Sequence, residues 1–277
     1  MGLSAIQSIS SQRSLYVQQQ SKVQKSQYNE PAKKVEKASE EIATGKRVNR
    51  AKDDAAAAAI AQKILSQYAG KIVGNNNTQD MSNALKVADG GLNSITDNLQ
   101  RMRELGLQAS NGILSNEDKA LIQEEINQIK EGIKDIVSGS EFNTKKLLDG
   151  SFQNMNTASN ADGSGTEVSI GDMGLDALGI KDFDVTGNFS LDTIDRALQK
   201  VSEERSSIGA MTNRLEHTYN SNSVAIENEM SSHSKLVDAN IGKSTMDYNI
   251  QNAITQYKIF AQRQMQNQMT QSINLMF

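Results

Sequence analysis

Apolar residues recur at alternating steps of four and three positions in separate segments of the chain, and this spacing constrains the fold most. It places these side chains on one face of a helix, as in helices that pack against partners in a coiled-coil-like manner. The chain has no proline after Pro31, so the strongest helix breaker is absent from residues 32–277. The segments comprise Met81, Leu85, Ala88, Leu92, Ile95, Leu99, Met102, Gly106 and Ala109; Ile122, Ile126, Ile129, Ile133 and Ile136; and Leu191, Ile194, Leu198, Val201, Arg205, Ile208, Thr212, Leu215, Tyr219, Asn222 and Ile226.

Two local signals refine this pattern. Ser115 and Asp118 have the spacing of a capping box, and we expect them to begin the helix that carries the second stripe. The third stripe includes Arg205, Thr212 and Asn222 at positions where apolar residues are expected. Polar residues on such a stripe cost stability but fix the register between helices.

Residues 151–189 differ from the helical segments, because Asn, Asp, Ser and Thr crowd around their glycines. Short apolar pieces at residues 167–170 and 183–185 predict small strands joined by turns. A cysteine-free segment of this size is marginal as an independent domain. We therefore predict a mainly α fold: a long coiled-coil-like helical bundle, built from the N- and C-terminal halves, with a small β-hairpin region in the middle of the chain.

The composition argues against several classes of function. The absence of cysteine excludes disulfides, thiolate nucleophiles and cysteine-ligated metals. A net charge of −4 and an aromatic content of 4% give no basic, aromatic-rich surface for nucleic acid. His217 and His233 lie too far apart on a predicted helix to share a metal ion. We predict no catalytic residue, no metal and no cofactor, and we expect that the protein is not an enzyme.

The sequence also bears on membranes and export. No stretch approaches the roughly 18 to 20 apolar residues that a membrane-spanning helix needs. Residues 1–20 alternate apolar residues with Ser and Gln and lack the apolar core of a secretory signal. We expect no membrane partner and, for an exported chain, no cleaved leader.

The two chain ends are alike in kind. Each carries an apolar face flanked mostly by uncharged polar residues, as expected of an amphipathic helix that is marginal alone in water. Two interpretations stay open: the ends pack on each other within one monomer, or they order only when they pack against copies of themselves. The face residues are Ile9, Tyr16 and Val23 at one end and Ile250, Ile254, Tyr257, Met265 and Met269 at the other.

The segment over residues 99–111 carries a second polar face. When Leu99 lies on the core stripe, Arg101, Glu104, Gln108 and Asn111 point away from it, at successive steps of three or four. This face is either a solvated surface with Arg–Glu pairs or a polar contact surface for another subunit.

Residues 44–54 predict a turn followed by a helix. We expect the turn at Gly45 and the start of the helix near Ala51, with Asp53 and Asp54 in its first turn, where acidic residues complement the helix dipole. The basic residues just before these acids do not predict nucleic-acid binding, because no aromatic residues lie between them.

Several of these segments resemble bacterial flagellin. Residues 43–56 (ATGKRVNRAKDDAA) are similar to the family's Ser-Gly-Leu-Arg-Ile-Asn-x-Ala-x-Asp-Asp-Ala-Ala signature, and residues 99–111 (LQRMRELGLQASN) match its Leu-Gln-Arg-x-Arg-Glu-Leu-x-x-Gln-x-x-Asn block. Further matches lie at residues 122–126 (IQEEI), 141–150 (EFNTKKLLDG) and 208–215 (IGAMTNRL). The resemblance covers most of the chain in the family's order.

The resemblance implies a structural subunit that self-assembles into the helical flagellar filament for motility. Residues 1–52 together with 238–277 would form an inner layer of terminal helices, and residues 53–237 a helical core with the β region at about 151–189. No outer domains are expected, because the space between the two halves is short. The residues expected at the hinge between these layers are Gly45, Arg47, Asn49, Asp53 and Asp54.

The resemblance also implies partners. The chain would pack with itself as a helical homopolymer, and an export chaperone, the filament cap and junction proteins would bind it during type III export to the cell exterior. A toll-like receptor of innate immunity is a further expected partner of released monomers. The expected subunit-contact and receptor surface comprises Arg101, Leu105, Gln108, Asn111 and Glu125, to which the spacing adds Glu104.

The chain departs from the family pattern at both ends. It lacks the usual Ile-Asn-x-Asn opening, has a longer N-terminal stretch, and contains Pro31, which we expect to end the first helix. Residues 234–240 (SKLVDAN) replace a Ser-Arg-Ile-x-Asp-x-Asp pattern. Two alternatives remain at this point: a hook–filament junction protein, which shares the terminal patterns, and a soluble helical binding or signalling module.

Overall fold

The computed structural model describes residues 29–274, without the side chains at positions 266, 269, 270 and 272–274. The chain divides into two compact units. One contains the described residues up to Ile64 and those from Ser231 onward, and the other is Leu65–Met230. Both boundaries fall inside long helices, beyond the expected division near 52 and before the one near 238. The predicted face residues Ile9, Tyr16 and Val23, and the side chain of Met269, lie outside the described part.

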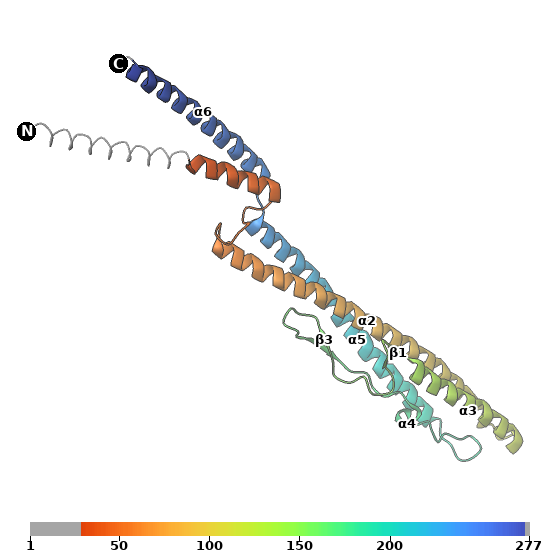
Figure 1. Cartoon of the computed structure of the whole chain (residues 1–277). Coiled ribbons are helices and arrows are strands. Elements are labelled where there is room, and N and C mark those ends of the chain that lie inside the picture. Colours follow the sequence, from red (N-terminus) through yellow and green to blue (C-terminus); the bar gives the residue numbers. More distant parts are fainter. Residues whose placement is uncertain (1–28, 275–277) are drawn as a thin grey trace, which may run out of the picture. The chain divides into compact units, whose positions relative to one another are not determined.

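Long helices dominate the unit Leu65–Met230. It contains most of α2 (Ala55–Ala109) and α5 (Asp192–Val237), which lie side by side in Figure 1, together with all of α3 (Asn116–Gly139). No proline interrupts any of these helices, and the apolar stripe of each faces the others. The mainly α architecture predicted from the sequence is confirmed.

Ion pairs between α2 and α5 define their antiparallel direction. Lys71 Nζ lies 2.6 Å from Glu229 Oε1, which joins an early turn of α2 to a late turn of α5. Farther along, Arg103 Nε lies 2.7 Å from Asp195 Oδ1, which joins a late turn of α2 to the first turn of α5.

The core follows the predicted apolar stripes. Their central members are almost completely removed from water, and burial of such side chains contributes roughly 1.5–3 kcal/mol each. Those with no exposed surface include Leu85, Ala88, Leu92, Ile95, Leu99 and Met102 on α2, Ile126 and Ile133 on α3, and Ile194, Val201 and Leu215 on α5.

Two of the polar residues on the α5 stripe have partners across the core. Arg205 Nε donates to Asp89 Oδ1 on α2 at 2.9 Å. Asn222, which is 8% exposed, donates through Nδ2 to the backbone oxygen of Ser159 at 2.8 Å. The second bond satisfies the buried Asn222 amide, which would otherwise be left unpaired beside apolar neighbours, whereas the first joins two partly exposed side chains.

The capping box predicted for α3 is confirmed. The Asp118 amide donates to Ser115 Oγ at 3.1 Å, and the Ser115 amide donates to Asp118 Oδ2 at 3.0 Å. This reciprocal pair satisfies two amides at the start of α3 and places its first residue at Asn116.

The middle of the chain forms two antiparallel hairpins. β1 (Glu141–Phe142) pairs with β2 (Lys145–Lys146), and β3 (Met155–Ala158) pairs with β4 (Gly165–Val168). Only the first half of the predicted strand at residues 167–170 lies in β4. The β region predicted for the middle of the chain is therefore present.

The prediction of a strand at residues 183–185 is wrong. The Val185 amide donates to Gln123 Oε1 at 2.8 Å, and Lys130 Nζ donates to the Phe183 carbonyl at 2.6 Å. Side chains of α3 thus satisfy the backbone groups that a partner strand would otherwise have satisfied.

The hairpins and the short helix α4 (Leu175–Leu178) share the helical core. Leu147, Leu148, Ile170 and Ile180 have no exposed surface and belong to the same apolar cluster as the stripes of α2 and α5. The β region is thus part of this unit and not a separate domain.

The other unit contains a helix over residues 29–44 and the helix α6 (Ile241–Asn274). Pro31 lies within the first of these helices and is buried. The helix that Pro31 is predicted to end would precede it, in residues outside the described part, so that expectation stays a prediction. The fixed backbone angle of proline is compatible with a helical turn, and only its missing N–H limits where it can occur.

Candidate assembly surfaces

Arg101 joins α2 to α3 on the polar face predicted from the sequence. Its Nε and Nη2 donate to Glu125 Oε1 at 2.9 and 2.7 Å, and its Nη1 donates to Glu104 Oε2 at 3.2 Å. The hydrogen bond with Glu125, followed by that with Glu104, raises the pKa of the Arg101 guanidinium above its ordinary value. The three side chains remain 45–69% exposed. They form a fixed but solvent-accessible charged cluster.

Leu105 does not belong to this exposed face. Its side chain is 2% exposed and packs in the core, because the buried face of α2 is wider than a strict four-three stripe. Gln108 is exposed, as predicted. Asn111 is also exposed but lies beyond Ala109, the last residue of α2, and its Oδ1 accepts a hydrogen bond from the Ile113 amide at 3.2 Å.

We name the exposed members of this set the Arg101 surface: Arg101, Glu104, Gln108, Asn111 and Glu125. Sequence reasoning missed a neighbouring ion pair, Arg103 with Asp195, in which each side chain is 48% exposed. A hydrogen bond with Asp195 raises the pKa of Arg103. The two residues are 92 positions apart, so no local spacing could have revealed the pair.

Residues 45–54, here called the connector, run along the junction between α5 and α6. Gly45 has a φ of +71°, which favours glycine, and its carbonyl accepts a hydrogen bond from the Ala239 amide at 2.9 Å. The Arg47 amide donates to the Val237 carbonyl at 2.6 Å, and Arg47 Nη2 donates to the Leu236 carbonyl at 2.6 Å. Arg47 therefore binds the backbone at the end of α5, and Gly45 binds the backbone between α5 and α6.

Asp53 organises the turn within the connector. Its Oδ2 accepts hydrogen bonds from the amides of Arg50 at 2.9 Å and Asn49 at 3.2 Å. The bond from the Arg50 amide is the largest of the effects that lower the pKa of the Asp53 carboxyl. The carboxylate form thus stabilises this turn.

Asp54 caps α2. Its Oδ1 accepts a hydrogen bond from the Ala57 amide at 2.9 Å, and this bond is the main cause of its lowered pKa. The prediction that the helix starts near Ala51 is wrong, because α2 begins at Ala55. Ala57 is the third residue of α2, and a side chain that accepts from the amide of the third residue belongs to the N-cap, the residue just before the helix. Asp54 is therefore the N-cap of α2.

The helix α6 carries large apolar side chains that its own unit leaves exposed. The exposure is far above that of core residues, which fall below a tenth. The exposed side chains include Met246 (58%), Ile250 (47%), Ile254 (38%), Tyr257 (73%), Phe260 (61%) and Met265 (61%).

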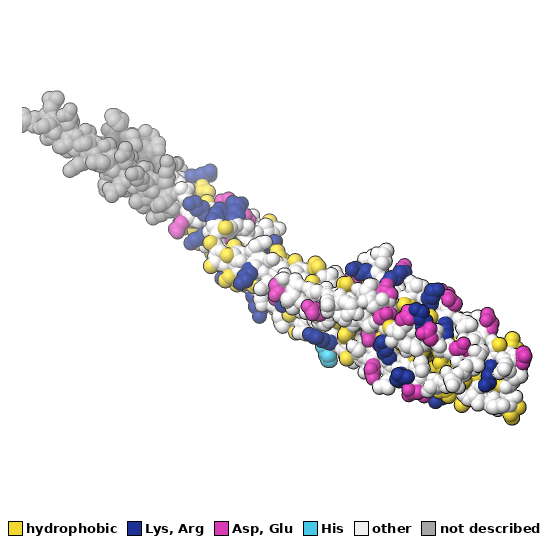
Figure 2. Space-filling view, turned by 90° about the horizontal axis from the view of Figure 1, so that it is seen from below, with side chains coloured by type: hydrophobic (Ala, Val, Ile, Leu, Met, Phe, Trp, Pro, Cys, Tyr) yellow, Lys and Arg dark blue, Asp and Glu magenta, His cyan; other side chains and the backbone are white. Residues whose placement is uncertain are grey.

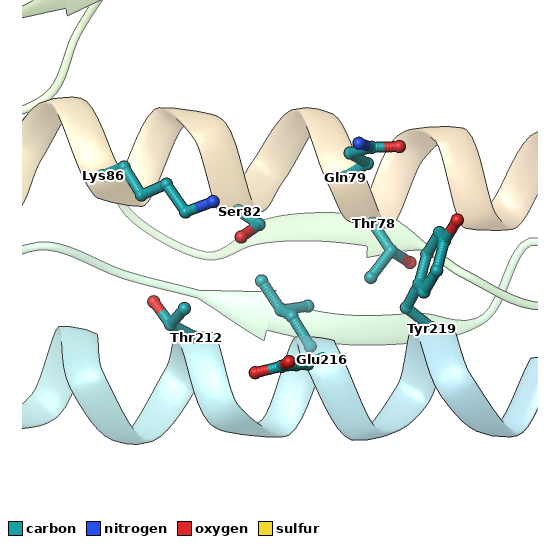
Figure 3. Close-up of a pocket in the computed structure, with 8 residues that line it drawn as sticks. Thr78, Gln79, Ser82, Lys86, Thr212, Glu216 and Tyr219 are labelled. Carbon is teal, nitrogen blue, oxygen red and sulfur yellow. The ribbon is translucent and has the colours of Figure 1, made fainter.

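A groove of about 290 Å³ lies between α2 and α5. Figure 3 shows side chains of both helices along it, with Thr78 and Ser82 on α2 facing Thr212 and Tyr219 on α5. Ligand sites are usually larger and mostly apolar, with a few convergent polar groups. This groove is small and mixed in polarity.

The surface shown in Figure 2 carries Lys, Arg, Asp and Glu side chains interspersed with one another and with apolar ones. Such a mixture creates no extended field of one sign. Within residues 29–274, no helix is both long and apolar enough to cross a bilayer. The long core helices and the exposed apolar residues of α6 define a helical protein that can contact other molecules through the faces of its helices.

Comparisons with known proteins specify this class. The models of the bacterial flagellin N-terminal helical region and C-terminal helical region match residues 13–153 and 191–276. The flagellar filament 33 kDa core protein of Treponema phagedenis is 35% identical over 86% of this chain and 91% of its own length. A flagellin of Halalkalibacterium halodurans is 36% identical over 80% of this chain and 84% of its own length.

A solved structure agrees with the fold. The structure of a putative flagellar hook-associated protein from Vibrio parahaemolyticus has a TM-score of 0.54 and 18% identity, and the match covers 67% of this chain and all of that one. The chain belongs to the bacterial flagellin family. It is a structural subunit of the extracellular flagellar filament, and the alternatives of a junction protein or a signalling module are not favoured.

Proposed function

We propose that the terminal helices drive polymerisation by burying their apolar faces against copies of the same chain. In this proposal residues 1–52 and 238–277 form the inner layer of the filament, and residues 53–237 form the layer around it. The observation that carries the proposal is the exposure of Tyr257 and Phe260 on α6, at 73% and 61%.

The energy scale supports this role. Burying a large apolar side chain completely contributes roughly 1.5–3 kcal/mol, so covering Tyr257 and Phe260 would contribute roughly 2–4 kcal/mol together. That gain offsets part of the conformational entropy lost when chain ends become ordered. A heterologous contact whose rotation does not close would then extend into a helix of subunits.

The test compares two variants of the full chain. Tyr257→Ser with Phe260→Ser removes exposed apolar surface from α6, whereas Gln264→Ser changes an exposed polar residue of the same helix. We expect the first variant to raise the critical concentration for polymerisation by at least about tenfold, the effect of about 1.4 kcal/mol. The second should polymerise as the parent does, and equal polymerisation by all three chains would overturn the proposal.

A truncation gives a second readout. Deleting residues 250–277 removes the distal part of α6 but leaves the core of the unit Leu65–Met230 intact. We expect a folded monomer with unchanged circular dichroism per helical residue and no filaments in electron micrographs. Filaments formed by this truncated chain after seeding would contradict the assigned role of α6.

We propose two further roles within assembly. The Arg101 surface contacts a neighbouring subunit, since its charged groups are held in place yet accessible. The connector, including Gly45, Arg47, Asn49, Asp53 and Asp54, sets the angle between the layers. Glu125→Gln keeps the shape of the Arg101 surface but removes its strongest ion pair, and slower subunit addition with unchanged thermal stability would support the first role.

The remaining partners are proposals that follow from family membership. Export occurs through the flagellar type III apparatus without a cleaved leader, with an export chaperone, and the filament cap and junction proteins flank the assembled chains. A toll-like receptor would bind the Arg101 surface of monomers. Filament assembly should compete with this binding, so binding that is equally strong for sheared filaments and monomers would argue against a shared surface.

A further inference from the structure

The loop between α2 and α3 contains the only Asn-Gly dipeptide of the chain, Asn111–Gly112. The residues from Ser110 to Ile113 are all exposed, and Ile113 is 90% exposed. α2 ends at Ala109 and α3 begins at Asn116, so the dipeptide lies outside both helices. The backbone of Asn111 is still hydrogen-bonded, because its amide donates to the Gln108 carbonyl at 3.1 Å and its carbonyl accepts from the Leu114 amide at 3.2 Å. The side-chain amide of Asn111 is therefore exposed next to the backbone N–H of Gly112, and Gly112 has no side chain to shield that N–H.

The Gly112 amide is free to react. Within residues 29–274, none of the hydrogen bonds has the Gly112 amide as its donor, and a Cβ added at Gly112 would meet no atom within 4 Å. The Asn111 side chain is held only through Oδ1, which accepts from the Ile113 amide, so its Nδ2 is not engaged there. Two groups one residue apart react efficiently when rotation can bring them into contact, and glycine permits that rotation.

We infer that Asn111–Gly112 is a site of spontaneous deamidation that places a negative charge on the Arg101 surface of the unassembled chain. The Gly112 nitrogen loses its proton to water or hydroxide and attacks Asn111 Cγ. A Cγ–N bond forms, the Cγ–Nδ2 bond breaks, and ammonia leaves, which produces a five-membered succinimide. Water then opens either of the two C–N bonds of the ring and yields aspartate or isoaspartate, without an enzyme, oxidant or reductant.

The product changes the surface in two ways. A neutral side chain becomes a carboxylate just beyond the C-terminus of α2, where the helix dipole disfavours negative charge. The isoaspartate form also inserts a methylene group into the backbone of the loop. The consequence for assembly rests on the proposed role of the Arg101 surface, whereas the reaction itself depends only on the loop.

The experiment incubates the full-length monomer at neutral and mildly alkaline pH and maps its peptides by mass spectrometry. We expect the mass change of amide to acid at Asn111, with isoaspartate detected by enzymatic methylation, and a faster rate at higher pH. Asn93 and Asn220 are internal controls, because each is exposed and precedes a serine but lies within α2 or α5. An unmodified Asn111, or equal modification at all three positions, would overturn the inference.

Gly112→Ala is the matched variant, because the open space and the ordinary φ at this position accept a methyl group without strain. We expect deamidation of this variant to slow by about tenfold, which corresponds to about 1.36 kcal/mol in the barrier. An unchanged rate would contradict the mechanism. Incubating filaments in parallel separates the two proposals: protection of Asn111 in filaments supports the subunit contact, and an equal rate in filaments and monomers removes Asn111 from that contact while leaving the deamidation site intact.

Discussion

Arg205 on α5 donates from Nε to Asp89 Oδ1 on α2 at 2.9 Å, at a position where the stripe of α5 would otherwise carry an aliphatic side chain. The two side chains are 35% and 45% exposed, so water screens much of their attraction. We expect a double-mutant cycle with Arg205→Ala and Asp89→Ala to give a coupling free energy of about 0.5–1 kcal/mol in urea unfolding.

A pair within one helix serves as the control. Lys134 and Glu131 lie one turn apart on α3 at 3.1 Å, with side chains 63% and 68% exposed. Their coupling should be about 0.2–0.5 kcal/mol, as for exposed helical pairs. If the two cycles gave equal coupling energies, the pair across α2 and α5 would add nothing beyond an ordinary surface ion pair.

Gly74 lies where the backbone after β3 crosses α2. A Cβ at this position would overlap the carbonyl oxygen of Ser159, which is backbone and cannot rotate away. Alanine gains roughly 1 kcal/mol over glycine inside a helix, but overpacking costs about 1–3 kcal/mol. We expect Gly74→Ala to lower the free energy of unfolding by up to about 2 kcal/mol, measured by urea denaturation.

Gly90 is the matched position on the same helix. It is exposed, and an added Cβ would meet no atom within 4 Å. Gly90→Ala should therefore stabilise the chain by about 0.5–1 kcal/mol. The prediction requires changes of opposite sign in the free energy of unfolding for the two variants. A stabilising Gly74→Ala would mean that the backbone at Ser159 does not pack closely against α2 at this position.

Much of the fold could be predicted because its signals are local. The four-three spacing around Leu92 and Leu99 identifies the buried face of α2, and the spacing of Ser115 and Asp118 identifies the first turn of α3. Each signal depends on side chains within a few turns, so a single sequence contains it.

What the sequence did not reveal depends on tertiary contacts. The alternation at residues 183–185 indicates a strand, but the position of Gln123 on α3 decides how that backbone is satisfied. Leu105 matches a family block in sequence, yet the width of the buried face of α2 places it in the core. Arg103 and Asp195 form an ion pair because the antiparallel packing of α2 and α5 brings the end of one helix next to the start of the other.

The connector should loosen in acid. Hydrogen bonds from the amides of Arg50 and Ala57 lower the pKa of Asp53 and Asp54 below the ordinary value of 3.8. A carboxyl with a depressed folded-state pKa contributes its full stabilisation above the unfolded-state pKa, and this contribution is lost as the pH falls through the folded-state pKa. We expect hydrogen-exchange protection of the Asn49, Arg50 and Ala57 amides to hold at neutral pH and decline below pH 3.8.

Asparagine provides the control for this prediction. In the variant with Asp53→Asn and Asp54→Asn, the side-chain oxygens can still accept the same hydrogen bonds but no longer titrate. Acid should then leave the relative protection of these amides unchanged. A decline of the same size in parent and variant would assign the acid sensitivity to other groups.

Two leucines two positions apart in α2, one buried and one exposed, separate stability from surface contact. Leu105 is 2% exposed and Leu107 is 59% exposed. We expect Leu105→Ala to lower the free energy of unfolding by about 2–5 kcal/mol through the cavity it leaves, and Leu107→Ala to change it by no more than about 0.5 kcal/mol. Urea unfolding of the monomer measures both values, and similar losses in the two variants would contradict the burial of Leu105. If Leu105→Ala also slows polymerisation, lowering the temperature should restore the rate, because the defect then arises from folding and not from a lost contact between subunits.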